Sequence, residues 1–172
     1  LHKFGKSFIP PAGFIRPVLD LPGLIGPNGL FGSKGGEKLF TKEQAVIFSR
    51  AKAKIETELD SLGKGPEQFG IVHADFCSRN FLIQNGKIAA IDFDTLGNGY
   101  YILDILYACL SEKEDETDQS LEYFVKGYEQ VMPVPKGLYE YKDAFIAISR
   151  LMDANWFASR QDNPSLRAIA SG

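Results

Sequence analysis

The feature that most constrains the fold is an Asn-Gly pair, Asn85-Gly86, that lies between two short apolar runs. Asn-Gly is the strongest short-range signal for a two-residue β-hairpin turn, because both central residues of that turn need positive φ. A two-residue turn at this position pairs Phe81 with Ala90. The sequence therefore predicts a hairpin over residues 81–90 whose register is set by the turn.

Polar residues flank the open end of this predicted hairpin. Asn80 precedes the first arm, Asp92 follows the second, and Asp75 follows a β-like run at residues 69–73. Strict pleat alternation would place Asn80 and Asp92 on opposite faces, so we expect Asp92 to lie just past the paired region. Two carboxylates and one amide oxygen then converge, and such hard oxygen ligands suit Mg²⁺ or Mn²⁺.

Helical patterns occupy most of the remaining chain. Thr41 and Gln44 form a capping box that opens a helix, and Gly63 ends it. Apolar residues of this helix recur at near-helical spacing, namely Ala45, Phe48, Ile55, Leu59 and Leu62. Further helices are predicted over residues 101–110, 121–131 and 141–160, and we interpret the acidic run 112–118 as a solvated break. The expected fold class is therefore α+β and mainly helical.

The first 36 residues carry many Gly and Pro residues, which exclude a long helix. Their apolar residues are too numerous for a flexible linker, so we expect an irregular segment lying on another part of the molecule. The Gly-rich stretch 32–36 lacks the Gly-Lys-Ser/Thr ending of a phosphate-binding P-loop. We interpret that stretch as an ordinary loop.

Composition excludes several classes of protein. The 172 residues carry 19 Lys and Arg against 22 Asp and Glu, for a formal net charge of −3, which argues against nucleic-acid binding through bulk charge. No apolar run reaches the length of a membrane helix, so no membrane partner is expected. With only two cysteines, Cys77 and Cys109, a disulfide framework is not expected. A reducing compartment, the cytoplasm, is the predicted location.

The polar residues around the hairpin form a longer pattern. It consists of His-Ala-Asp at residues 73–75, Asn80, and Ile-Asp-Phe-Asp at residues 91–94. This pattern resembles the catalytic segment of the aminoglycoside phosphotransferase and choline kinase family, which shares the protein-kinase plan. The segments 1–17 and 101–105 also resemble that family's C-terminal lobe, so the resemblance covers nearly the whole chain, but as one lobe only.

The resemblance implies a role for each residue of the pattern. Asp75 would be the catalytic base, and Asn80 and Asp92 would be the metal ligands. The other implied roles are supporting ones: His73 and Arg79 as catalytic-loop support, Asp94 as a possible phosphate, metal or substrate contact, and Asp104 as a structural residue.

The sequence departs from the family pattern at two places. Ala74 replaces the Gly that follows the family's His, a small change within a tight turn. Cys77-Ser78-Arg79 replaces the common His-Pro-Gly, which adds a cation beside the predicted metal site.

The implied reaction is transfer of the ATP γ-phosphate to a hydroxyl of a small molecule, with Mg²⁺ or Mn²⁺ as cofactor. A kinase of this plan also needs a nucleotide-binding lobe, with a Gly-rich loop and a β-strand Lys. Residues 1–172 supply neither, so we expect the whole chain to be a C-terminal lobe that is inactive without its N-terminal partner lobe. The first residue is Leu1 and not Met, which we interpret as the cut edge of a longer protein.

Other interpretations of the same residues stay open. The chain could be a non-catalytic kinase-like binding module, or a metal-dependent hydrolase using the same acids. His73, Asp75 and Cys77 alternate like ligands of a zinc site, although a structural site needs four ligands. Cys77 as a nucleophile is a weaker alternative, since His73 is the one histidine close to it in sequence.

The acceptor is not specified by the pattern. Acidic residues in the last third of the chain, namely Asp143, Asp153 and Asp162, could suit a cationic acceptor such as an amino sugar or a quaternary amine. Solvated surface acids are the default alternative for these three positions.

Overall fold

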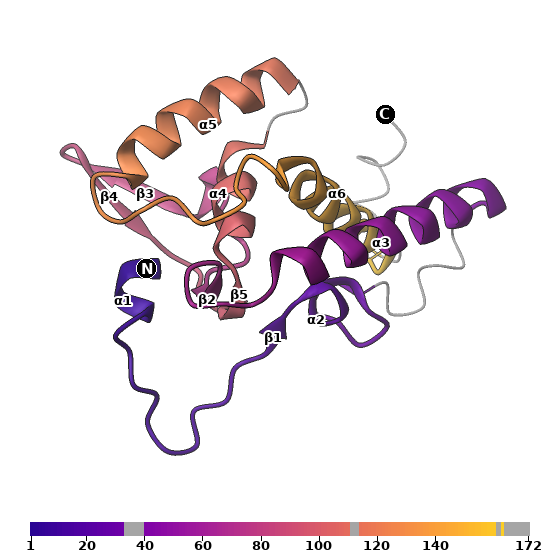
Figure 1. Cartoon of the computed structure of the whole chain (residues 1–172), viewed down its shortest axis with the longest axis horizontal. Coiled ribbons are helices and arrows are strands. Elements are labelled where there is room, and N and C mark those ends of the chain that lie inside the picture. Colours follow the sequence, from indigo (N-terminus) through magenta and orange to yellow (C-terminus); the bar gives the residue numbers. More distant parts are fainter. Residues whose placement is uncertain (33–39, 111–113, 161–162, 164–172) are drawn as a thin grey trace.

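The computed structural model describes residues 1–32, 40–110, 114–160 and 163. Over these residues the chain combines six α-helices with two small sheets (Figure 1). The helices are α1 His2–Gly5, α2 Leu21–Ile25, α3 Lys42–Leu62, α4 Tyr101–Cys109, α5 Glu114–Tyr128 and α6 Lys142–Ala158. The strands are β1 Val18–Leu19, β2 Phe69–Val72, β3 Phe81–Gln84, β4 Lys87–Ala90 and β5 Gly97–Tyr100. The prediction of a mainly helical α+β fold is confirmed.

A three-stranded sheet in the order β1-β5-β2 lies against α4. Strand β5 pairs in parallel with β1 and antiparallel with β2. Neither β1 nor β5 was predicted, because β1 is only two residues long and β5 contains Gly and Asn, which are poor strand formers. Two close approaches explain the glycines: a Cβ on Gly97 would lie 2.6 Å from Leu19 Cδ1, and one on Gly99 would lie 2.8 Å from Val72 Cγ2.

Helix α3 begins with the predicted capping box. Gln44 N–H donates to Thr41 Oγ1 over 3.2 Å, and Thr41 N–H donates to Gln44 Oε1 over 2.8 Å. The C-terminal half of the helix packs into the core through Ile55, Leu59 and Leu62. The N-terminal half is largely exposed, so the expected apolar face extends over only half of the helix.

Helix α4 is the centre of the hydrophobic core. Every side chain from Tyr101 to Leu106 is buried, and the helix packs against α5, α6 and the sheet (Figure 1). Helix α6 contributes Phe145, Ile148 and Met152, which recur at helical spacing and are fully buried. The predicted helices over 101–110 and 141–160 are confirmed within one or two residues.

The acidic run was wrongly interpreted as a break. Helix α5 begins at Glu114, so residues 114–118 of the run are helical, while 112 and 113 lie outside the described residues. Acidic residues near a helix N-terminus interact favourably with the helix dipole, so this composition favours a helix start. Buried Leu121 and Val125, four residues apart, hold α5 on the core.

In the part of the chain that the structure describes, no helix is both long and apolar enough to cross a membrane. Residues 33–36 of the Gly-rich stretch, and Asp162, lie outside the described residues.

Candidate active site

The predicted hairpin has the predicted register. Strands β3 and β4 pair Phe81 with Ala90, and the turn residues Asn85 and Gly86 have φ of 51° and 72°. Just past the Phe81–Ala90 pair, the two strands are joined by one more hydrogen bond, which Ile91 N–H donates to the Asn80 backbone carbonyl oxygen over 3.0 Å. The hairpin therefore holds the two arms together up to the first polar residues.

Asp92 lies past this paired region, as expected. Strand β4 ends at Ala90, and Asp92 adopts a left-handed backbone with φ of 64°. This conformation breaks the pleat alternation that would have directed Asn80 and Asp92 to opposite faces.

The loop between β2 and β3 brings Asp75 and Asn80 into direct contact. Asn80 Nδ2 donates to the backbone oxygen of Asp75 over 2.7 Å and to Asp75 Oδ2 over 3.0 Å. The short 3-10 helix Ser78–Asn80 closes the loop. Both bonds use the amide nitrogen of Asn80, so its carbonyl oxygen stays available as a hard ligand for a cation.

Negative charge accumulates beside this loop. The pKa of Asp92 is raised by the charge of Asp94 and by a hydrogen bond with Asp94, and the charge of Asp75 adds to the effect. The three carboxylates are therefore close enough to repel one another. A divalent cation would relieve that repulsion, so the donor set fits the predicted metal.

His73 supports the loop from within the core. It is buried, its Nε2 hydrogen-bonds the Ile91 carbonyl oxygen over 2.9 Å, and Asp75 N–H donates to its Nδ1 over 3.3 Å. The ring also contacts Phe93, with ring centroids 4.8 Å apart. Because both ring nitrogens are occupied, His73 cannot bind zinc in this arrangement. Among the residues described, no three His, Cys, Asp or Glu side chains are placed to hold one metal ion, so the predicted divalent cation would need the amide oxygen of Asn80 as a ligand.

Cys77 lies on the same loop as Asp75. Its thiol donates a long hydrogen bond to Asp75 Oδ1, at 3.7 Å. Burial raises the pKa of this thiol, and the charge of Asp75 raises it further. Both effects reduce the thiolate fraction, which opposes a role for Cys77 as a nucleophile.

Asp104 on α4 holds the start of the loop. Its Oδ2 accepts the backbone N–H of His73, and its Oδ1 accepts that of Ala74, each over 2.8 Å. Asp104 Oδ2 also lies 3.0 Å from His2 Nε2, and His2 Nδ1 lies 2.8 Å from the Tyr128 hydroxyl. No local motif marks His2 as a partner of Asp104, because the two residues lie 102 positions apart.

Ala74 occupies a strained position in this loop. It is fully buried and has φ of 66°, in the left-handed region that favours glycine. An L-residue costs about 1–2 kcal/mol in that conformation. The two bonds to Asp104 from His73 and Ala74 offset this cost and hold the loop in place.

Arg79 is exposed on the loop, and a second group of polar residues lies on α4 and α6. Tyr107 Oη donates to Asp153 Oδ1 over 3.1 Å. Burial raises the pKa of Asp153, while its bond to Tyr107 and the charges of Arg150 and Arg79 lower it. Asp143, by contrast, is exposed at the start of α6. The sequence analysis singled out Asp153 but missed Tyr107, whose position only the packing of α4 against α6 reveals.

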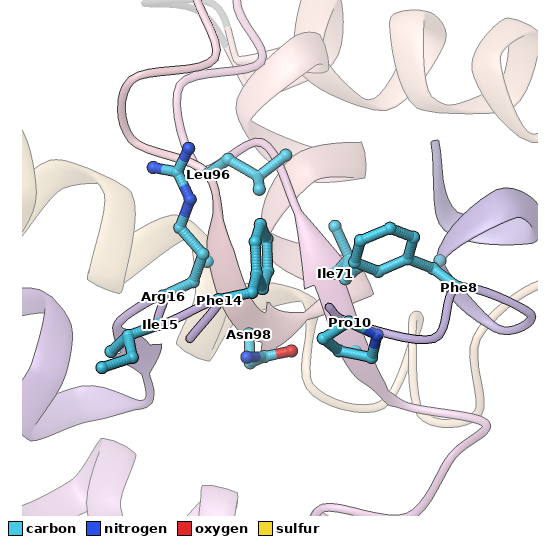
Figure 2. A pocket seen from close by; sticks show the side chains of 11 residues that line it. Phe8, Pro10, Phe14, Ile15, Arg16, Ile71, Leu96 and Asn98 are labelled. Atoms are coloured by element: carbon cyan, nitrogen blue, oxygen red, sulfur yellow. The ribbon is translucent and has the colours of Figure 1, made fainter. Parts of the chain in front are cut away.

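A cavity of about 330 Å³ lies elsewhere, on the sheet face next to residues 5–16 (Figure 2). Phe8, Pro10 and Phe14 line it from that segment, and Ile71 and Asn98 line it from β2 and β5. None of the predicted catalytic side chains lines this cavity. The candidate active site is therefore the open loop surface, and not this hollow.

Comparison with known proteins assigns the family. The model of the phosphotransferase enzyme family matches residues 1–141, which include the whole loop and hairpin. The chain belongs to the phosphotransferase enzyme family. Its fold is therefore protein-kinase-like, as the resemblance implied.

Individual relatives agree with that assignment. The amicoumacin kinase of Bacillus subtilis (strain 168) is 34% identical over 101 residues, which is 53% of this chain and 30% of the kinase. A microcompartment-associated aminopropanol kinase has a similar structure, with a TM-score of 0.81 and 25% identity over 98% of this chain and 54% of that one.

A solved amicoumacin kinase in complex with AMP-PNP and Ca²⁺ shares the fold. Its TM-score is 0.73 at 19% identity, over 99% of this chain and 52% of that one. The chain thus spans about half the length of the solved relatives, and less of the amicoumacin kinase from Bacillus subtilis.

Proposed function

We propose that this chain is the catalytic lobe of a kinase that transfers the ATP γ-phosphate to a hydroxyl of a small molecule. The observation that carries the proposal is that the loop brings Asn80 into contact with Asp75, while the hairpin bonds Ile91, the neighbour of Asp92, to the Asn80 backbone. General bases and divalent-metal ligands need this proximity in phosphoryl transfer. Family membership supports the reaction class.

Asp75 is proposed to accept the proton of the acceptor hydroxyl. The hydroxyl oxygen forms a bond to the γ-phosphorus as the bond from that phosphorus to the β–γ bridging oxygen breaks, and ADP leaves. The Asp75 carboxylate is half-buried and held by Asn80, so it is oriented without being enclosed. A positioned base of this kind contributes roughly 10²–10⁴-fold to a rate.

Asn80 and Asp92 are the residues we propose to hold Mg²⁺. The carbonyl oxygen of Asn80 is unused by the loop's own bonds, and Asp92 is crowded by the charge of Asp94. When bound, the metal neutralises charge on the transferring phosphate. His73 and Asp104 keep the loop in shape, and Asp94 contributes negative charge beside the ligands.

We further propose that a nucleotide-binding lobe precedes this chain in the full-length protein. The β3–β4 hairpin leaves three aliphatic side chains exposed beside the site, Leu82 at 57%, Ile83 at 73% and Ile88 at 70%. Exposed apolar groups gathered on one element are typical of a covered interface. The matched kinases are about twice as long as this chain, which is consistent with a further lobe.

The acceptor class is supported by the relatives. One matched kinase acts on amicoumacin and another on aminopropanol, by their names. A solved relative holds AMP-PNP and Ca²⁺, which supports ATP and a divalent cation here. We infer that the acceptor of the full-length protein is likewise a small hydroxylated molecule.

The test is Asp75→Asn in the full-length protein. We expect phosphate transfer to fall by about 10²–10⁴-fold, as is typical when a general base is lost, with an unchanged melting temperature. Asp143→Asn, on the exposed start of α6, is the matched control and should keep full activity. Near-normal turnover by Asp75→Asn would refute the assignment.

A further inference from the structure

The cavity beside residues 5–16 lies on the outer face of the three-stranded sheet (Figure 2). Strand β2 pairs Ile71 with Asn98 of β5, so these two side chains point to the same face of the sheet. The next residue, Val72, is fully buried, which places the core on the opposite face. Ile71 and Asn98 therefore form the floor of the cavity, whose volume of about 330 Å³ is at the lower end of the range for ligand pockets.

An aromatic contact holds the wall of the cavity in place. Phe8 and Phe14 meet edge to face, with ring centroids 5.4 Å apart, and so join the two limbs of the segment 5–16. Between them lies a turn in which Phe14 N–H donates to the Pro11 carbonyl oxygen over 3.0 Å. Pro10 and Pro11 have a fixed φ, so this part of the wall loses little entropy when a ligand binds.

Two polar side chains of the lining are free to bind a ligand. Arg16 is the one charged residue among the described residues that line the cavity, and within the described part of the chain it makes no ion pair. Its guanidinium lies 5.9 Å from the Phe14 ring centroid. The side-chain amide of Asn98 likewise makes no hydrogen bond to a described residue. In Figure 2 the guanidinium and this amide lie on opposite sides of the Phe14 ring.

The charge around the cavity favours an anion. Residues 1–19 contain Lys3, Lys6 and Arg16 but no Asp or Glu, although the whole chain has a net charge of −3. An arginine stays protonated in proteins and presents a planar fork that binds a carboxylate through two parallel hydrogen bonds. Since Arg16 is the one cation of the described lining, it matches a single negative charge, and the second charge of a phosphate group would have no partner.

We propose that this cavity binds a small aromatic carboxylate that carries a hydroxyl group at the far end of its ring. The carboxylate binds Arg16, the ring packs against Phe14 and Ile71, and the hydroxyl hydrogen-bonds Asn98. A third ring extends the contact between Phe8 and Phe14, because aromatic rings stabilise one another beyond the area that they bury. The site is separate from the candidate active site, since none of the predicted catalytic side chains lines the cavity.

The first experiment titrates three probes into the full-length protein by calorimetry, without ATP. The probes are 4-hydroxyphenylacetate, 2-(4-hydroxyphenyl)ethanol, which lacks the carboxylate, and phenylacetate, which lacks the hydroxyl. We expect the alcohol to bind at least about tenfold more weakly than the hydroxylated acid, because it loses a hydrogen bond between two charged groups. Phenylacetate should bind about fivefold more weakly, as is typical for the loss of a neutral hydrogen bond. Equal binding of acid and alcohol, or no measurable binding of the acid, would overturn the proposal.

Arg16→Gln isolates the contribution of the carboxylate. We expect the affinity for 4-hydroxyphenylacetate to fall at least about tenfold, with the affinity for the alcohol changing less than about twofold. Arg16→Lys, which keeps the charge but loses the fork, should fall between wild type and Arg16→Gln. Arg50→Gln, which changes an exposed arginine on α3, is the matched control. Equal losses for acid and alcohol in Arg16→Gln would contradict the assignment.

Asn98→Ala tests the contact with the hydroxyl. The backbone N–H of Asn98, which donates to the Pro17 carbonyl oxygen over 2.9 Å, is kept in this variant. We expect the preference for 4-hydroxyphenylacetate over phenylacetate to disappear, while the affinity for phenylacetate changes less than about twofold. A preference that survives the substitution would place the hydroxyl elsewhere and contradict the proposed orientation.

Cyclohexylacetate, compared with phenylacetate, tests the aromatic ring of the ligand. We expect it to bind about threefold more weakly, because it keeps the carboxylate but cannot form a ring–ring contact. Phe14→Leu should remove this difference, whereas Phe4→Leu, which changes an exposed ring outside the lining, should keep it. Equal binding of the two acids by the wild-type protein would contradict the aromatic class of the ligand.

Asp75→Asn separates this site from the proposed kinase function. The affinity for phenylacetate should change less than about twofold in this variant, because Asp75 does not line the cavity. A loss of binding would place the acid at the active site and overturn the proposal, and so would ATP-dependent phosphorylation of 4-hydroxyphenylacetate. If the acids bind as expected but no acceptor is phosphorylated by the wild-type protein, the kinase function is wrong and the carboxylate site stands.

Discussion

The inner side of the catalytic loop, which packs on α4, and its outer side, which is exposed, differ in whether their carboxylates are neutralised by hydrogen bonds. On the inner side, the buried carboxylate of Asp104 is hydrogen-bonded to two backbone N–H groups and to His2. On the outer side, Asp92 and Asp94 crowd one another. On the inner side both carboxylate oxygens are hydrogen-bonded within the protein, whereas on the outer side we propose that the charges bind ligands.

The contrast shows how a loop with strained backbone can keep mutually repelling carboxylates close together. Ala74 and Asp92 both have positive φ, which L-residues rarely adopt. Strain of this kind persists only where surrounding structure over-determines it, and Asp104, His73 and the hairpin provide that support. Variants of the inner side should therefore reduce stability, and variants of the outer side should change binding and reactivity.

The largest stability effect is expected for Asp104→Asn. The variant keeps the shape but presents an amide N–H₂ to backbone donors, so at least one buried N–H loses its acceptor. We expect the free energy of unfolding to fall by about 3 kcal/mol, measured by urea denaturation. Asp143→Asn should change it by less than about 0.5 kcal/mol. A fully stable Asp104→Asn variant would contradict the support role of the inner side.

His2→Ala should have the next largest effect. It leaves the Tyr128 hydroxyl and one contact of Asp104 without a partner inside the core. We expect a loss of about 2 kcal/mol in the free energy of unfolding, measured in the same way. Phe4→Ala changes an exposed side chain of the same helix and serves as the control. Equal losses for His2→Ala and Phe4→Ala would show that the contact with Asp104 adds nothing.

Asp94→Asn should weaken Mg²⁺ binding without unfolding the protein. Removing one carboxylate beside Asp92 reduces the local negative charge, and the attraction between a unit charge and a divalent ion at about 5 Å in an exposed site is about 1.7 kcal/mol, roughly a fifteenfold change in affinity. Titration calorimetry with Mg²⁺ measures this directly. An unchanged or higher Mg²⁺ affinity would argue against metal binding at this surface.

Thiol labelling should show the smallest effect and distinguish the two cysteines. Burial raises the pKa of Cys109 to about 12, so it should stay unmodified by iodoacetamide at pH 8 until the protein unfolds. Cys77 should react slowly, because its own pKa is raised in part by the charge of Asp75. Asp75→Asn lowers that pKa and should speed labelling of Cys77 by roughly threefold. No change in rate would show that the two side chains do not interact in solution.

Local sequence signals predicted much of this architecture. The Asn85-Gly86 turn, the capping box of α3 and the helix predicted over residues 141–160 each depend on signals within a short segment, and each was confirmed. The elements that the sequence did not predict depend on contacts between residues far apart in the chain. Helix α5 is held on the core by buried Leu121 and Val125, and β5 forms because β1 and β2 flank it.

The sequence by itself determined the hairpin register, the family pattern and hence the set of candidate catalytic residues, because these depend on spacing along the chain. Only the tertiary structure decided which charges are neutralised and which remain open. His2 lies 102 positions from Asp104, and Tyr107 lies 46 positions from Asp153. Contacts over such separations depend on helix packing, which no local pattern encodes.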